Sequence, residues 1–267
     1  LLVRNSRLNR REDRIHPFRL AAGDAEGMTR MYLGPSDNMH CLMEYDRPDT
    51  FNDHIEVETV TLDRFLEDAV YGPLGLERTG FKPSVGPFAA TSHGNPFEFR
   101  MVHDTAFGYR FHGDPEAWNG WRRHTLVGEV NDGNAHHAHG GVAGHAGLFS
   151  TARELNRLLM LLLDEGAAPG GDAADGKTRL FLPRVVKTFL TPALPGQALG
   201  WQLPPWAPPG SFSHTGFTGT FVMGIPHRQL SVVLLTNRQN YGVDPEARYP
   251  ELSRFQQDVV KALLRGP

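Results

Sequence analysis

Two neighbouring β-rich segments near the C-terminus most constrain the fold. Residues 211–224 and 229–236 are rich in β-branched and aromatic side chains and flank a turn at 225–227, which predicts an antiparallel hairpin. An amphipathic helix begins near Pro250, with an apolar stripe of Leu252, Phe255, Val259 and Leu263. Strand, strand and terminal helix predict an α+β domain in which helices flank an antiparallel sheet.

The best-marked helix lies upstream of this hairpin. Thr151 and Glu154 have the spacing of a capping box, and Gly166 is predicted to end the helix. The apolar stripe between them consists of Leu155, Leu158, Leu159 and Leu162. Three to four apolar residues at this spacing are typical of a helix that covers a core.

Two shorter helices are also predicted. One begins at Thr61 and stops at Gly72-Pro73. Its predicted inner face is Leu62, Phe65, Leu66, Ala69 and Val70. The other begins at Pro183, a favoured first position of a helix. Its predicted inner face is Val185, Val186 and Phe189.

Two regions lack regular periodicity. Residues 72–148 are rich in Gly, Pro, His and aromatic residues, so we interpret them as a long, folded but irregular excursion that forms a substrate-cleft insertion. Residues 1–58 mix charged, His and scattered apolar residues without helical or strand periodicity. We therefore expect a poorly patterned, weakly ordered segment at 1–58 and one domain at 59–267.

Bulk composition excludes several classes of function. The formal net charge of −3 argues against a general nucleic-acid or anionic-membrane binder. Cys41 is the only cysteine, so neither an intrachain disulfide nor a Cys-based metal site can form. The longest apolar run, 158–163, is too short for the roughly 18 residues of a transmembrane segment. Compartment and oligomeric state stay open.

Three segments carry a family resemblance. They are YGPLGLERTGF at 71–81, GGVAGHAGLFSTA at 140–152, and HTGFTGT at 214–220 followed by VVLLTNR at 232–238. In this order and spacing they resemble the serine β-lactamase, DD-peptidase and esterase superfamily, specifically its class C-like branch. The resemblance covers roughly residues 59–267. It implies amide or ester hydrolysis through an acyl-enzyme, on a peptidoglycan-like peptide, a β-lactam or a simple ester, without cofactor or metal.

The resemblance also implies a site on the first β-rich segment. His214 offers a nitrogen donor and Thr215 a hydroxyl to a substrate carboxylate or carbonyl, and these two are the candidate catalytic residues. Gly216 has no side chain, so a flat small-molecule or peptide substrate can lie against the backbone. The backbone N–H of Phe217 corresponds to one half of the family's oxyanion hole. Gly216 and Phe217 are therefore the candidate substrate-binding residues.

The family's nucleophile motif is missing from these 267 residues. A Ser at the start of a helix and a Lys one turn later share one face, which allows proton transfer between them. The positions three residues before the four lysines, Lys82, Lys177, Lys187 and Lys261, hold Thr79, Ala174, Arg184 and Asp258. Tyr-x-Asn, the family's second element, is absent too. We therefore expect an N-terminally incomplete serine hydrolase, inactive as this chain alone, whose N-terminal part is absent through processing, trimming, a start partway through a longer gene, or a truncated gene model or reading-frame error. The alternative is a non-catalytic ligand-binding relative, a pseudoenzyme.

Two serines offer rival interpretations. Ser36-Asp37-Asn38 matches the Ser-x-Asn form of the second element, but it lies in the aperiodic segment, and coincidence is the favoured explanation. Ser92 in ATSHG, residues 90–94, loosely resembles a nucleophile elbow. A true elbow follows a buried strand and opens a helix, whereas Ser92 lies between Pro87 and Pro96. We interpret it as a loop serine.

A histidine cluster is the remaining rival. His136, His137, His139 and His145 gather among glycines, and His-x-His can bind zinc. No Asp or Glu stands nearby at ligand spacing, so a zinc ion would need ligands from elsewhere in the chain. We therefore expect no metal site.

Overall fold

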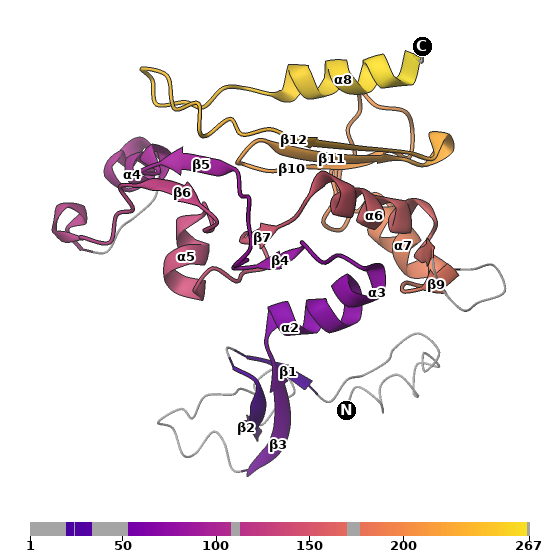
Figure 1. The fold of residues 1–267 in the computed structure, drawn as a ribbon, viewed down its shortest axis with the longest axis horizontal. Helices are drawn as coiled ribbons and strands as arrows, with labels where there is room; N and C mark the ends of the chain where they lie inside the picture. Colours follow the sequence, from indigo (N-terminus) through magenta and orange to yellow (C-terminus); the bar gives the residue numbers. More distant parts are fainter. Residues whose placement is uncertain (1–19, 24, 34–52, 108–112, 170–176, 266–267) are drawn as a thin grey trace. The chain divides into compact units, whose positions relative to one another are not determined.

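The computed structural model describes residues 20–23, 25–33, 53–107, 113–169 and 177–265 (Figure 1). It divides into two compact units, Leu1–Asp68 and Ala69–Pro267. Each unit is described by itself. The predicted boundary after residue 58 falls inside a strand of the first unit, and as a domain limit it stays a prediction.

The first unit contains a three-stranded sheet in the order β1-β3-β2. Its strands are β1 (Leu20–Ala22), β2 (Gly27–Leu33) and β3 (Asp53–Val60). β3 pairs parallel to β1 and antiparallel to β2. The sequence did not predict these strands. In β3, only Val57 and Thr59 are buried, and Thr59 is polar. The period-2 alternation of a half-buried strand is therefore hidden in the sequence.

The helix predicted from Thr61 is three consecutive helical pieces. They are α2 (Leu62–Leu66), a π-helical turn η1 (Glu67–Tyr71) and α3 (Gly72–Leu74). The prediction that Gly72-Pro73 stops the helix is wrong, because Pro73 occupies the start of α3, where no N–H is needed. Leu62 and Phe65 are exposed, since the wider π turn breaks the single face that a continuous α-helix would present.

An antiparallel sheet in the order β10-β11-β12 forms the core of the second unit. The strands are β10 (Phe212–Thr215), β11 (Thr220–Ile225) and β12 (Leu230–Leu235). The predicted turn is present as a short helix, η4 (Pro226–Arg228). The first predicted strand, 211–224, is in fact two strands, because a tight turn at 216–219 reverses the chain between β10 and β11.

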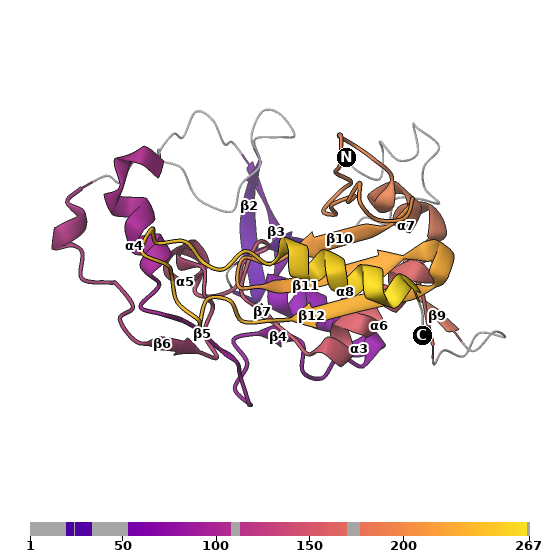
Figure 2. The ribbon, with the colours of Figure 1, turned by 90° about the horizontal axis from the view of Figure 1, so that it is seen from above.

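Helices cover both faces of this sheet, which confirms the predicted α+β class (Figures 1 and 2). On one face, Val260 of α8 (Ser253–Arg265) packs with alternate residues of β11. On the other face, Leu159 and Leu163 of α6 (Ala152–Leu163) pack with Phe212. The residues that cluster with Val260 are Phe221, Met223, Ile225 and Val232.

One helix buries a face other than the predicted one, and another buries only one residue of its predicted face. In α8, Val260 is fully buried, whereas Phe255 is 50% exposed, so the stripe is displaced by about one residue. In α7 (Pro183–Leu190), Val186 is buried, but Val185 and Phe189 are exposed. Both segments carry more apolar residues than one stripe needs, and the neighbouring elements decide which residues turn inward.

Short elements replace the irregular excursion predicted at 72–148. β4 (Gly80–Phe81) pairs with β7 (Leu148–Phe149), and β5 (Ala90–His93) pairs with β6 (Thr125–Val127). The helices here are α4 (Pro96–His103), η2 (Thr105–Phe107), η3 (Pro115–Ala117) and α5 (Gly133–His139). A further two-stranded ribbon, β8 (Ala167–Pro169) with β9 (Lys177–Arg179), follows α6.

The N-terminus of α6 confirms the predicted cap. The Thr151 Oγ1 accepts a hydrogen bond from the Glu154 N–H, at 3.3 Å. The Glu154 carboxylate does not complete a capping box. It is buried, and it accepts hydrogen bonds from the Arg78 N–H and the Thr79 hydroxyl. Glu154 therefore fastens the segment between α3 and β4 to the start of α6.

Candidate substrate-binding site

The backbone of β10 has one free edge next to the turn at 216–219. The Ser213 N–H donates to the Gln202 oxygen at 2.9 Å, and the Gln202 N–H donates to the Ser213 oxygen at 2.8 Å. In an antiparallel strand, successive residues direct their backbone groups alternately toward the partner strand and away from it. Ser213 therefore faces away from β11, His214 faces β11, and Thr215 faces away again. Gln202 covers the edge at Ser213, and the Thr215 backbone points to the same side, where no described residue pairs with it.

The two candidate catalytic side chains lie on opposite faces of β10. His214 pairs with Val222 and Thr215 pairs with Phe221, and successive side chains of a strand alternate between faces. His214 is exposed, and the Thr215 Oγ1 accepts a hydrogen bond from the Gln202 side-chain amide at 3.2 Å. A ligand that contacts both residues must therefore lie along the strand edge. Their role in binding stays a prediction.

The turn at 216–219 directs one backbone N–H outward. The Gly216 N–H donates to the Thr220 oxygen at 2.7 Å, and the Gly219 N–H donates to the Gly216 oxygen at 3.0 Å. Phe217 is the second residue of this β-turn. The hydrogen bond that closes the turn joins its first and fourth residues, so it does not use the Phe217 N–H. Gly216 is required here, because a Cβ would lie 2.1 Å from the Thr220 Oγ1.

Aromatic and cationic side chains surround Phe217. Its ring centroid lies 5.1 Å from that of Phe97 on α4 and 5.9 Å from that of Tyr249. The Arg238 guanidinium carbon stands 5.1 Å from the Phe217 ring centroid. Burial raises the pKa of the Tyr249 hydroxyl above its ordinary value. Phe217 itself is 47% exposed, so its outer surface is accessible to a ligand.

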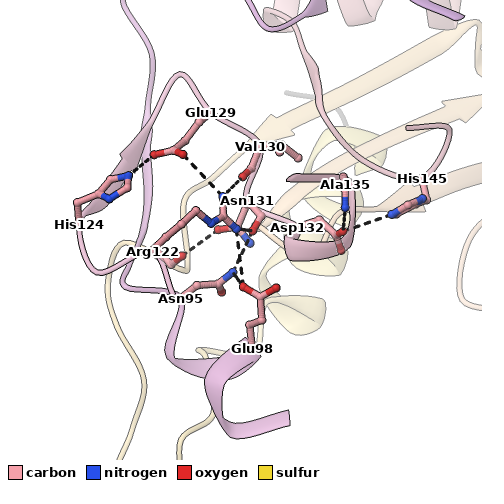
Figure 3. Close-up of polar contacts among 11 residues, drawn as sticks. Asn95, Glu98, Arg122, His124, Glu129, Val130, Asn131, Asp132, Ala135 and His145 are labelled. Carbon is pink, nitrogen blue, oxygen red and sulfur yellow. Dashed lines mark hydrogen bonds and ion pairs between the residues drawn. The ribbon is translucent and has the colours of Figure 1, made fainter. Parts of the chain in front are cut away.

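A buried arginine organises the excursion that supplies Phe97 (Figure 3). Arg122 is only 7% exposed. Its guanidinium donates to the Val130 oxygen and to the Asn131 oxygen, the latter at 2.7 Å. Carboxylates of Glu98 and Glu129 lie 3.7 and 3.9 Å from the guanidinium nitrogens. These contacts partly offset the cost of a buried charge, although the Arg122 Nε has no hydrogen-bond partner among the described residues, and they join α4 to the segment between β6 and α5, which is a structural role.

Glu98 is the acidic partner whose environment is most altered. Burial raises the pKa of its carboxyl group, and the nearby Asp132 raises that pKa further, while Arg122 opposes both effects. The Asn95 side chain donates to the Glu98 carboxylate at 2.7 Å. Asp132 also accepts from the Ala135 N–H and contacts the His145 Nε2 at 3.3 Å (Figure 3).

The two serines considered as rival nucleophiles have different outcomes in the structure. The prediction that Ser92 lies in a loop is wrong, because it lies in β5. It is fully buried, and its hydroxyl donates to the Asn131 side-chain oxygen at 2.9 Å. It is therefore withdrawn from solvent, unlike the serine of a nucleophile elbow. Ser36-Asp37-Asn38 lies outside the described residues.

The histidine cluster spreads over α5 and the loop that follows it. The His136 and His137 rings are 4.6 Å apart, and the His139 and His145 rings are 6.2 Å apart. Burial lowers the pKa values of His136 and His137, with smaller contributions from nearby positive charge. Within the described ranges, no group of three or more His, Cys, Asp or Glu side chains is arranged to hold a metal ion.

Several residues around the turn were not predicted from the sequence. Gln202, Phe97 and Tyr249 come from separate segments, and no local pattern marks them. Arg238 could have been found, because it ends the VVLLTNR segment that carries part of the family resemblance. Its position next to Phe217 depends on the pairing of β10, β11 and β12.

A helix-flanked antiparallel sheet, with His214-Thr215 on its edge strand and Gly216 in the turn that follows, is the arrangement expected of the β-lactamase-related class of serine hydrolases. The family model described as Beta-lactamase matches residues 56–254. The chain therefore belongs to the β-lactamase-related serine hydrolase family.

Curated relatives agree with this assignment. Proteins described as "Putative D-alanyl-D-alanine carboxypeptidase" from Escherichia coli K12 and Salmonella schwarzengrund are 31% and 33% identical over 216 and 204 residues. These matches cover 73% and 68% of this chain, but 45% and 42% of the relatives. The chain thus spans less than half the length of these relatives. No helix in the described ranges is long and apolar enough to cross a membrane.

Proposed function

We propose that this chain supplies the substrate-binding strand of a serine hydrolase that cleaves an amide or ester through an acyl-enzyme. The substrate class is a peptidoglycan-like peptide, a β-lactam or a simple ester. One observation carries the proposal: the free edge of β10 leads into the outward Phe217 N–H. An extended substrate can pair with the Thr215 backbone, which brings its carbonyl oxygen toward the Phe217 N–H.

The side chains at this edge suit an acidic or carbonyl-rich ligand. His214 is exposed at the end of β10 and can donate a hydrogen bond from a ring nitrogen. Thr215 accepts from Gln202 and keeps its own hydroxyl proton for a ligand oxygen. The names of the curated relatives, which refer to D-alanyl-D-alanine, support a peptide ligand that ends in a carboxylate.

We propose further that the 267 residues alone do not turn substrate over. No Ser stands three positions before any of the four lysines, so this sequence provides neither the nucleophile nor its neighbouring base. The same observation favours the second candidate function, a relative that binds the ligand without cleaving it.

Three measurements on the 267-residue chain test the proposal. Amide NMR should show a shift of the Phe217 and Thr215 signals on titration with N-acetyl-D-alanyl-D-alanine, and His214→Ala should weaken that binding about tenfold. Fluorescent penicillin should leave no covalent label, and a nitrophenyl ester should release no burst of nitrophenol. Absence of any shift at the β10 edge would remove the binding role.

A label or burst would instead contradict the proposed lack of turnover. Mass mapping of a fluorophosphonate adduct would then identify the serine, including Ser36. Ser92 should stay unlabelled because it is fully buried.

A further inference from the structure

We infer that Arg238 is a positioning residue that fixes the Phe217–Thr218 peptide plane and so holds the turn that presents the Phe217 N–H. The inference depends on the proposed function in one respect only, namely that a ligand uses this N–H. The geometric part stands on contacts between the exit of β12 and the turn at 216–219.

Phe217 lies between two peptide planes, and each is held by a different contact. In the plane before it, the Gly216 oxygen accepts the Gly219 N–H at 3.0 Å. A trans peptide places its N–H opposite its carbonyl, so this bond turns the Phe217 N–H out of the turn. In the plane after it, the Phe217 oxygen accepts the Arg238 Nε–H at 2.8 Å.

The second plane would be loose without Arg238. Phe217 and Thr218 are the two central residues of the β-turn, where rotation of the peptide plane between them converts one turn type into another. That rotation changes the φ of Thr218 and the ψ of Phe217. The Arg238 hydrogen bond opposes it directly, because it holds the carbonyl of the rotating plane.

Arg238 is itself held by two contacts besides its bond to the Phe217 oxygen. Its Nη1 donates to the Pro250 oxygen at 3.4 Å, and its guanidinium stacks 5.1 Å from the Phe217 ring centroid. Thr236, two residues earlier, donates its hydroxyl to the Gly219 oxygen. A planar guanidinium with several fixed donors loses less freedom per hydrogen bond than a lysine would. The exit of β12 therefore acts as a rigid support for the turn.

A matched pair of variants isolates the hydrogen bond. In Arg238→Gln, the side-chain amide nitrogen is the same number of bonds from the backbone as the Nε of arginine. This variant therefore keeps a hydrogen-bond donor but loses the charge. The methionine side chain in Arg238→Met reaches about as far as that atom and provides no hydrogen-bond donor. Comparison of the two separates positioning through the hydrogen bond from any effect of the charge.

The experiment uses the 267-residue chain without ligand and then with two probes. Without ligand, amide hydrogen exchange of Gly219, whose N–H is bonded inside the turn, should quicken about tenfold in Arg238→Met and less than about threefold in Arg238→Gln. The amide of Met223 in the sheet should exchange as in the wild type, which excludes general unfolding. Equal exchange in all three proteins, or equally fast exchange in both variants, would overturn the inference.

The two probes are N-acetyl-D-alanyl-D-alanine and its C-terminal amide. A positioning role predicts that Arg238→Met weakens binding of both by a similar factor of about ten and that Arg238→Gln largely restores it. Loss confined to the carboxylate probe would mean that Arg238 contacts the ligand directly, which contradicts positioning. If the wild type binds neither probe, the proposed function fails, while the exchange measurements still decide the role of Arg238.

Discussion

Gly219 lies so close to Thr236 that no side chain fits between them. A Cβ on Gly219 would be 2.9 Å from the Thr236 Oγ1 and 3.0 Å from the Arg238 N, and the φ of Gly219 is +109°. Both backbone conformation and space therefore require glycine at the end of the turn that carries Phe217.

Gly219→Ala should destabilise the protein by about 3 kcal/mol, because it adds a steric conflict to the cost of a positive φ. Gly242→Ala is the matched control. Gly242 has a φ of +89° with open space around its Cβ position, so this change should cost about 1 kcal/mol. Urea denaturation measures both. Equal losses of unfolding free energy in the two variants would show that the close approach to Thr236 does not contribute to the cost of Gly219→Ala.

Glu154→Ala should lower the free energy of unfolding by about 3 kcal/mol. The change leaves the Arg78 N–H and the Thr79 hydroxyl without their acceptor in a part-buried position. Glu154→Gln keeps one acceptor oxygen and should lose roughly half as much. Chemical denaturation provides the measurement, with the neighbouring exposed residue changed in Glu77→Ala as the control. A loss as small as that control would contradict a supporting role for Glu154.

The stability difference between wild type and Glu98→Gln should change with pH. Burial raises the folded-state pKa of Glu98 above its ordinary value of 4.5, so the folded state binds more protons than the unfolded state in the interval above that value. Stability contributed by Glu98 is therefore lost as the pH rises through this interval. Wild type should lose free energy of unfolding relative to Glu98→Gln as the pH rises above 4.5. A difference that grows with pH would oppose the assigned direction.

Val260→Ala should destabilise the protein by about 2 kcal/mol, because it removes two fully buried methyl groups between α8 and the sheet. Phe255→Ala, on the exposed side of the same helix, should change stability by less than about 0.5 kcal/mol. Thermal or urea unfolding of the two variants compares the observed helix face with the one predicted from the sequence. A larger loss at Phe255 would favour the predicted face.

The sequence predicted those features that depend on near neighbours in the chain. Thr151 caps α6 through the N–H of Glu154, three residues away, and the turn at Pro226 separates two β-rich stretches. The antiparallel sheet flanked by helices follows from these same local patterns. The family resemblance located the β10 segment, because its three motifs occur in a fixed order.

Features that depend on distant contacts were not predicted. The break at 216–219 lies between two stretches of β-favouring residues, and the turn is held by Thr236 and Arg238, which follow β12. The buried side of α8 is selected by the sheet against Val260. The strands at 20–60 carry few buried apolar residues, so their alternation is weak. In each case the deciding partner lies tens of residues away in sequence.

The pairing of Gln202 with Ser213 limits what can join the sheet at β10. An uncovered strand edge can recruit strands from other molecules and so lead to aggregation. Here the doubled hydrogen bond at Ser213 closes one end, and the turn after Thr215 closes the other. Among the described residues, only a short stretch of the β10 backbone stays open, which is too short for the long strand that intermolecular sheet growth requires.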